Sequence, residues 1–231
     1  YKLTDIPNPT LVTLRDNKAK WNLPEYRRTG YRNLHKINRY GILLRSDYIL
    51  ELNENHKNEI KEIPSVKEMT GHKSFCSLIV GKEQDIFYEK YADDFSSFQP
   101  QTIMSISKMF LNIFVGELLE KGKLLLEKPI SYYLPNIGRG YAEATVQNVL
   151  NMNIVNAFTE DYTDPYSTSF MHETVGGWRI PDEGTNEVLQ KDFLNQIGTD
   201  VSGSVINNTD NAYYKSANSD VIALLIEKIS D

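Results

Sequence analysis

An apolar segment that opens with polar side chains constrains this chain more than any other feature. Residues 101–124 read QTIMSISKMFLNIFVGELLEKGKL, with Ser105 and Lys108 in the first turn of the helix predicted over 104–121. Apolar residues go most of the way round this helix, so we expect it to be buried on most of its faces. Gly122 is the expected end, because glycine commonly follows a helix C-terminus.

The spacing of Ser105 and Lys108 suits nucleophilic catalysis. A serine hydroxyl is a weak nucleophile near neutral pH and needs a base within hydrogen-bond reach. Positions i and i+3 at a helix start share a face, so the Lys108 amine can lie beside the Ser105 hydroxyl. Burial favours the neutral amine, and free N–H groups at a helix N-terminus can polarise an acyl oxygen. The pattern therefore predicts a nucleophile and its base, although S-x-x-K alone arises by chance about once in a chain of this length.

The elements around this helix predict a mixed α/β (α+β) fold. Two β-rich runs, 74–81 and 86–92, flank a short turn and predict a hairpin. The segment 153–185 is expected to be a long loop. Further helices are expected over 145–152, which begins at the N-cap candidate Thr145, over 186–198, and over 217–231.

Composition separates the N-terminal part from the remainder and excludes some partners. Residues 1–63 carry 12 Lys and Arg against 8 Asp and Glu, whereas all 231 residues together have a formal net charge of −6. We expect 1–63 to form an extended arm and the first elements, with one or two strands over 39–52, and 64–231 to form the main domain. The acidic balance argues against nucleic acid as a partner. No run of 18 apolar residues predicts a membrane span.

The metal-binding and redox residues give weaker signals. The four histidines show no ligand spacing, so no metal is expected, and no organic cofactor either. The single cysteine, Cys76, excludes an intrachain disulfide and leaves the compartment open. Trp178, in GGWRIP, is predicted to line the mouth of a pocket, since aromatic side chains often line ligand clefts.

Four sequence blocks, in this order, resemble the serine β-lactamase-like superfamily, which includes penicillin-binding proteins. Relatives share an S-x-S-K before an apolar helix, then G-K-L-x-L-x-x-P-I-x-x-Y-L-P, then T-V-x-x-L-L-x-M, then Y-x-S-x-N-x-D-x-L. In this chain the first two blocks run together as MSISKMFLNIFVGELLEKGKLLLEKPISYYLPNI. The third block reads ATVQNVLNM, and the fourth reads YYKSANSDVIALLIEKISD. The likeness is greatest to the branch of class C-like esterases and 6-aminohexanoate-dimer (nylon-oligomer) hydrolases, and it covers about residues 74–231. It implies a β-lactamase/transpeptidase-like fold, with an antiparallel sheet flanked by helices and a mostly helical region.

The resemblance also implies roles for particular residues. Ser105 would be the acylated nucleophile, Lys108 its base, and Tyr214 a proton relay to the leaving group. Tyr213 is the alternative to Tyr214, and only the Y-x-S spacing favours Tyr214. Ser216 and Asn218 are the candidates for hydrogen bonds to a substrate.

Two departures from the family pattern stand out. Where most relatives have M-T-S-G, this chain reads NMNIVNAF over 151–158. The third motif, K-T-G or H-x-G, is absent before the last residue, Asp231. We therefore expect the C-terminal strands and final helix of the fold to lie in a second chain or segment that completes the domain.

The predicted function is that of a serine hydrolase acting on a small amide or ester through an acyl-enzyme on Ser105. One alternative is a penicillin-recognising D,D-peptidase or β-lactamase, which a K-T-G motif would favour. The other is a non-catalytic binding or regulatory homologue that keeps the fold. A bacterial source is implied by the resemblance, which leaves periplasmic, secreted and cytoplasmic locations open.

Overall fold

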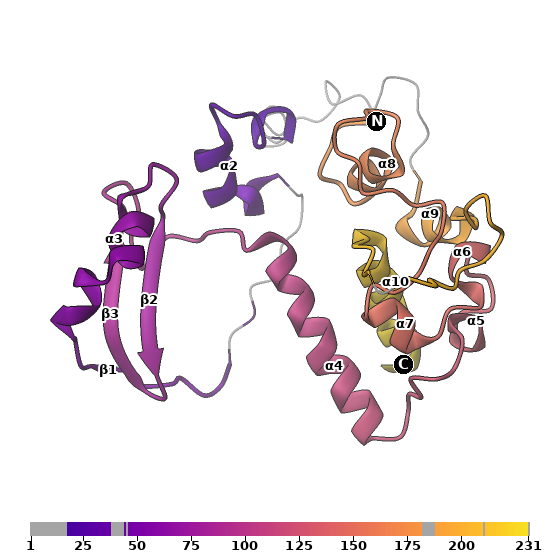
Figure 1. The fold of residues 1–231 in the computed structure, drawn as a ribbon, viewed down its shortest axis with the longest axis horizontal. Coiled ribbons are helices and arrows are strands. Elements are labelled where there is room, and N and C mark those ends of the chain that lie inside the picture. Colours follow the sequence, from indigo (N-terminus) through magenta and orange to yellow (C-terminus); the bar gives the residue numbers. More distant parts are fainter. Residues whose placement is uncertain (1–17, 38–43, 45, 182–187, 210, 231) are drawn as a thin grey trace, which may run out of the picture. The chain divides into compact units, whose positions relative to one another are not determined.

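The structure, a computed structural model, describes residues 18–37, 44, 46–181, 188–209 and 211–230 (Figure 1). The chain divides into two compact units, Tyr1–Thr102 and Ile103–Asp231. The division falls inside the predicted 64–231 domain, and a domain boundary at residue 63 stays a prediction.

A small sheet organises the first unit. Strands β2 (Ser77–Lys82) and β3 (Asp85–Tyr91) pair antiparallel, with an irregularity between Val80 and Gly81. The short strand β1 (Asn53–Glu54) pairs in parallel with the other edge of β3, which gives the order β1-β3-β2. The predicted hairpin is confirmed. The strands predicted over 39–52 lie partly outside the described residues, and the described part forms none.

Helical segments lie where the sequence predicts an extended arm. The first unit also contains α2 (Arg27–Arg32), η2 (Leu34–Lys36), η3 (Asn58–Glu62) and α3 (Pro64–Gly71). Helix α2 is tied to the loop after β3, because Arg28 and Arg32 both pair with the carboxylate of Asp94. These two guanidinium groups hold the pKa of Asp94 well below its usual range. Residues 27–32 are helical, so the prediction of an extended arm is wrong for them. Long-range charge pairing of this kind leaves no periodic signal in the sequence from which the helix could be predicted.

The second unit is helical and has its core around the last helix. Its elements are η4 (Met104–Lys108), α4 (Met109–Glu120), α5 (Ile130–Tyr133), α6 (Arg139–Ala142), α7 (Val146–Leu150), α8 (Thr168–Val175), α9 (Gln190–Gln196) and α10 (Ser216–Ser230). Helix α10 packs against α4, α5, α7 and α9 (Figure 1). Its residues Val221, Ile222 and Leu225 are buried in one continuous hydrophobic cluster with side chains from those helices.

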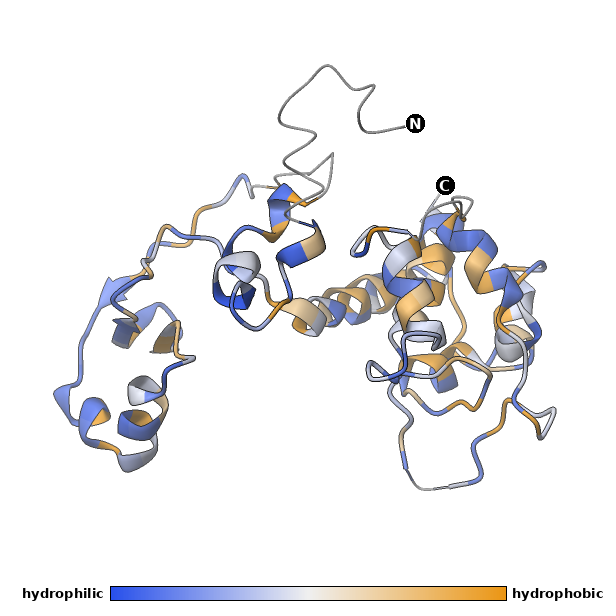
Figure 2. Cartoon of the chain, turned by 90° about the horizontal axis from the view of Figure 1, so that it is seen from above, coloured by the Kyte–Doolittle hydropathy of each residue, from blue (hydrophilic) through white to orange (hydrophobic). Residues whose placement is uncertain are grey.

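Helix α4 is less buried than its sequence predicts. Val115 and Leu118 are buried, whereas Met109 and Ile113 are 63% and 65% exposed. Figure 2 shows hydrophobic residues in successive turns of this helix. Within the second unit α4 packs on α10, and Leu111 and Leu119 also contact the core, but the side chains on the opposite side stay largely exposed. The prediction of burial on most faces is wrong there.

Local signals placed several helix ends correctly. The Thr145 side chain accepts a hydrogen bond from the Asn148 N–H, as expected of an N-cap. Gly122 has a φ of 65° and follows α4 as predicted, with its N–H bonded to the Leu119 carbonyl. Helix α8 is a correction, since a continuous loop was predicted over 153–185. None of the helices among the described residues is long and apolar enough to cross a membrane.

Candidate active site

The backbone is strained immediately before Ser105. Met104 has a φ of 46°, in the left-handed region that residues other than glycine seldom adopt. Such a conformation costs about 1–3 kcal/mol and persists only where the surrounding structure enforces it. The following turn, η4, is a 3₁₀ helix rather than the predicted first turn of an α-helix, and α4 begins only at Met109. This tight turn presents Ser105 with its side chain on the surface of the second unit.

Two side chains meet at the Ser105 hydroxyl. The Lys108 Nζ donates a hydrogen bond to Ser105 Oγ over 2.9 Å. The Tyr214 hydroxyl donates to the same oxygen over 2.7 Å, although 109 residues separate the two in sequence. The Lys108 amine also lies 5.5 Å from the centre of the Tyr214 ring. Both nitrogen and phenol therefore lie within proton-transfer distance of the serine oxygen.

The environment makes Tyr214 a stronger acid than an ordinary tyrosine. Partial burial acts to raise the pKa of Tyr214, but hydrogen bonds with Ser105, Lys108 and Ser216 outweigh it and the pKa is lowered. The nearby Lys108 charge acts in the same direction. A phenol whose ionised form is favoured can accept a proton from a neighbouring hydroxyl. The backbone N–H of Tyr213, the alternative candidate, donates a hydrogen bond to the Met152 carbonyl. The tyrosine hydroxyl that donates to Ser105 Oγ is that of Tyr214.

Ser216 lies at the start of α10, two residues after Tyr214. Its backbone N–H donates to Glu160 Oε2 over 2.9 Å, and its hydroxyl donates to Glu160 Oε1 over 2.6 Å. The hydroxyl proton of Ser216 is therefore used within the protein, and only its oxygen lone pairs remain for other partners. Its binding of a substrate stays a prediction.

Asn218 and Trp178, the other predicted binding residues, lie in different surroundings. The Asn218 side chain is fully buried, accepting from the Tyr141 hydroxyl over 3.0 Å and donating to the Val149 carbonyl over 3.2 Å. Its amide thus joins α6, α7 and α10 and is not part of the Ser105 cluster. Trp178 follows α8, and its indole lies close against Gly176. A role for Trp178 at a pocket mouth remains a prediction.

A second polar contact involves Asp220, in the N-terminal part of α10. His172 on α8 pairs with Asp220 on α10, and the His172 ring stacks on Phe193 of α9. These contacts join three helices of the second unit. Among the described residues, no three His, Cys, Asp or Glu side chains gather closely enough to hold a metal ion.

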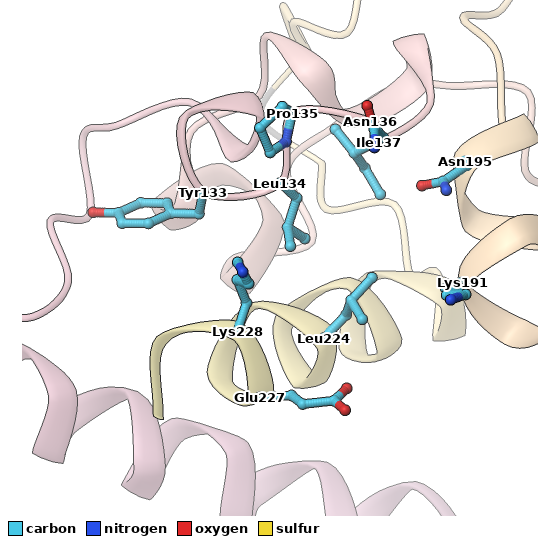
Figure 3. Close-up of a pocket in the computed structure, with 10 residues that line it drawn as sticks. All are labelled: Tyr133, Leu134, Pro135, Asn136, Ile137, Lys191, Asn195, Leu224, Glu227 and Lys228. Carbon is cyan, nitrogen blue, oxygen red and sulfur yellow. The ribbon is translucent and has the colours of Figure 1, made fainter. Parts of the chain in front are cut away.

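A cavity of about 350 Å³ lies elsewhere in the second unit (Figure 3). It is bounded by the 133–137 segment, by α9 and by the C-terminal half of α10, and none of Ser105, Lys108 and Tyr214 lines it. Its polar lining includes Lys191, Asn195 and Lys228. This cavity is therefore separate from the Ser105 cluster.

Sequence reasoning missed Glu160 and Lys215. Glu160 lies in the segment expected to be a loop, 56 residues from its partner Ser216. Lys215 is buried, with its amine hydrogen-bonded to the Phe158 carbonyl, and burial lowers its pKa. No local pattern pairs residues at such separations, although the position of Lys215 inside the Y-x-S block was a usable signal.

The chain is similar to known proteins in sequence and in fold. No protein-family model matches the chain. A 6-aminohexanoate-dimer hydrolase of Paenarthrobacter ureafaciens is 27% identical over 169 residues, which cover 73% of this chain and 41% of the relative. A solved structure from Bacillus anthracis, provisionally assigned as a 6-aminohexanoate-dimer hydrolase, matches with a TM-score of 0.74 at 15% identity. That match covers 92% of this chain and 57% of the other, so the chain spans about half the length of these relatives.

The chain therefore has a mixed fold of helices and a small sheet similar to that of a 6-aminohexanoate-dimer hydrolase, as the sequence blocks predict. The sequence match points to the same relatives and confirms the predicted resemblance. Both relatives carry hydrolase names, in agreement with the predicted enzyme class.

Proposed function

We propose that the chain is the Ser105-bearing part of a serine hydrolase that cleaves an amide or ester through an acyl-enzyme. The observation that carries this proposal is the convergence of Lys108 Nζ and Tyr214 OH on Ser105 Oγ, at 2.9 Å and 2.7 Å. A nucleophile held by two groups able to take its proton is the arrangement expected for covalent catalysis. The hydrolase names of both relatives support the same class.

The first half-reaction forms the acyl-enzyme. Ser105 Oγ attacks the carbonyl carbon, and its proton passes to the Lys108 amine or the Tyr214 phenolate. The lowered pKa of Tyr214 favours the phenolate and so supports Tyr214 in this role. As the carbon–nitrogen or carbon–oxygen bond breaks, Tyr214 returns a proton to the leaving group. The backbone N–H of Ser105, in the first turn of η4, is a candidate to bind the developing oxyanion.

The second half-reaction releases the acyl group. Water attacks the ester carbonyl on Ser105, loses its proton to the same base, and the carbon–Oγ bond breaks as Ser105 regains its hydrogen. Each proton moves between Ser105, Lys108 or Tyr214 and the leaving group or water, and no atom changes its oxidation state. The names of the relatives make a linear amide the first substrate class to test.

The test is covalent labelling of the 231-residue chain with a fluorophosphonate, followed by intact mass and peptide mapping. We expect one adduct, on Ser105, because phosphonylation needs an activated hydroxyl. Lys108→Ala should slow labelling by about 10²-fold or more, the usual loss on removing a general base.

Ser107 provides the matched control. It lies two residues away in the same turn, and its hydroxyl donates to the Met104 carbonyl. Ser107→Ala should leave labelling intact, whereas Ser105→Ala should abolish it. A folded chain that forms no adduct on Ser105 would contradict the proposal and leave a non-catalytic binding homologue as the better interpretation.

A further inference from the structure

Glu160 gathers three hydrogen bonds at the start of α10. Its two carboxylate oxygens accept from the Ser216 N–H over 2.9 Å and the Ser216 hydroxyl over 2.6 Å. The Tyr162 hydroxyl donates to the same carboxylate. Hydrogen bonds to an ionised acceptor are about twice as strong as those between neutral groups. The first residue of α10 is therefore held by both its backbone and its side chain.

The residue between Tyr214 and Ser216 is held by the same segment. Lys215 is only 7% exposed, and its amine donates to the carbonyl of Phe158. The Glu160 charge acts to raise the pKa of Lys215 against the effect of burial, so carboxylate and amine attract each other. Residues 158–160 thus bind two successive residues of the chain that carries Tyr214.

Tyr214 itself has little packing to fix it. Its side chain is 47% exposed, yet its hydroxyl lies 2.7 Å from Ser105 Oγ. A half-exposed tyrosine has rotamer freedom that a single hydrogen bond restrains only weakly. The position of the phenol therefore depends on the backbone that carries it, and that backbone is fixed immediately afterwards by Glu160.

We propose that Glu160 is a positioning residue, which holds Ser216 at the start of α10 and thereby fixes the Tyr214 hydroxyl against Ser105. Glu160 makes no contact with the reacting atoms in this role. The proposal rests on the proposed function for its consequence in catalysis, but its structural part concerns only Glu160, Ser216 and Tyr214.

The informative variant is Glu160→Gln, which keeps the size of the side chain. A glutamine has one acceptor oxygen, and an NH₂ donor replaces the other carboxylate oxygen. It therefore cannot accept all three hydrogen bonds, two from Ser216 and one from Tyr162, in the same geometry. The matched control is Glu117→Gln on α4, which removes a carboxylate that pairs with the surface residue Lys121. Both variants should retain the circular dichroism spectrum of the parent.

The first readout follows Tyr214 directly and needs no turnover. The chain is labelled with [ζ-¹³C]tyrosine, and the Tyr214 signal among the 14 tyrosines is assigned by its loss in Tyr214→Phe. In Glu160→Gln the Tyr214 titration should move up toward that of an ordinary tyrosine, because the phenol leaves the partners that lower its pKa. Glu117→Gln should not move it. An unchanged Tyr214 titration in Glu160→Gln would overturn the proposal.

The second readout is the rate of fluorophosphonate labelling. Glu160→Gln should slow labelling about tenfold, less than the 10²-fold or more expected when an acid–base group is removed outright. In a Tyr214→Phe background the same change should alter the rate less than about twofold, because residues that act through each other are not additive. Equal losses in both backgrounds would show a general effect on folding and contradict the positioning role.

The two readouts separate this proposal from the proposed function. A chain that never labels at Ser105 but whose Tyr214 signal moves in Glu160→Gln would reject the hydrolase and keep the positioning role. A chain that labels normally in Glu160→Gln, with an unmoved Tyr214 signal, would reject the positioning role and keep the hydrolase.

Discussion

Ser105 Oγ accepts hydrogen bonds from Lys108 Nζ and from the Tyr214 hydroxyl. Tyr214 is neutral at low pH, and its hydrogen bonds with Ser105, Lys108 and Ser216 favour its ionised form. The lowered pKa of Tyr214 brings the phenolate closer to working pH, so Tyr214 is the group whose titration should control the reactivity of Ser105.

A pH profile tests this. The active form of Tyr214 as a proton acceptor is the phenolate, so labelling should accelerate as the pH rises through the pKa of Tyr214. That pKa lies below the tyrosine value of about 10, so the plateau should be reached at a lower pH than an ordinary tyrosine would give. The measurement is the second-order labelling rate from about pH 6 to pH 10.

The control for the pH profile is Tyr214→Phe. It should remove the acceleration and lower the plateau rate by about 10²-fold. Tyr213→Phe, which changes the neighbouring phenol, should leave the profile in place. A profile that survives in Tyr214→Phe would assign the titration to another group.

A substitution at Asn218 can distinguish a structural role for this residue from the predicted substrate-binding role. Its side chain is fully buried between the Tyr141 hydroxyl and the Val149 carbonyl. Asn218→Ala should lower the free energy of unfolding by about 1–3 kcal/mol, because both buried groups lose their partner. Urea unfolding followed by far-ultraviolet circular dichroism would measure it.

The exposed Asn112 on α4 is the control for that change. Asn112→Ala should be within about 0.5 kcal/mol of the parent, as most surface substitutions are. If Asn218→Ala kept the free energy of unfolding of the parent but lost reaction with substrate, the prediction of Asn218 as a substrate-binding residue would be correct instead.

At the scale of elements, the start of α4 and the start of α10 create the site. The left-handed Met104 and the 3₁₀ turn η4 present Ser105, and the contacts of residues 158–160 hold the start of α10 beside it. Neither helix could place its residues alone. The packing of α10 against α4 brings the two starts together. Elsewhere in the unit the backbone also makes close contacts, as at Gly140 beside Gly198.

Two glycines give a matched test of those close contacts. At Gly140 in α6, a Cβ atom would lie 2.4 Å from the Gly198 carbonyl oxygen, whereas at Gly116 in α4 it would meet no atom within 4 Å. Gly140→Ala should destabilise the chain by about 1–3 kcal/mol through overpacking. Gly116→Ala should stabilise it by about 0.5–1 kcal/mol through helix propensity.

Urea midpoints at constant m-value would measure both changes. The two substitutions add the same methyl group, so opposite signs would show that the space at each site decides the outcome. A stabilising Gly140→Ala would mean that the backbone of α6 and the 198 segment do not approach each other so closely.

At the scale of the whole molecule, buried apolar residues are unevenly shared. Of the described buried hydrophobic residues, only Trp21 and Ile37 belong to the first unit, and the others form the cluster in the second. The first unit relies on its small sheet and on the pairing of Arg28 and Arg32 with Asp94. Hydrophobic burial is the dominant stabilising contribution in folding, so the two units should differ in stability.

Limited proteolysis tests this difference. Digestion with a low amount of a nonspecific protease should remove the first unit early and leave a resistant fragment that begins near residue 103 and retains α10. Cleavage of a transiently opened unit follows its opening free energy, which is smaller where few apolar side chains are buried. Survival of a fragment ending near residue 102, with loss of the second unit, would contradict this prediction.

Local sequence determined the parts of this protein that depend on neighbouring residues. The hairpin, the Thr145 cap, the glycine after α4 and the final helix follow from alternation, capping chemistry and backbone freedom within a few positions. The pairing of Ser105 with Lys108 also follows from i, i+3 spacing. The Y-x-S block, through its resemblance to known hydrolases, indicates Tyr214 from sequence alone.

Only the tertiary structure decided which distant residues meet. It placed Tyr214 rather than Tyr213 on Ser105, gave Asn218 to the core, and joined Glu160 to Ser216. It also left one side of α4 with fewer partners than its composition suggests. The physical reason is common to all four: burial and long-range hydrogen bonds depend on how helices pack, and the packing of distant helices leaves no periodic mark on either segment alone.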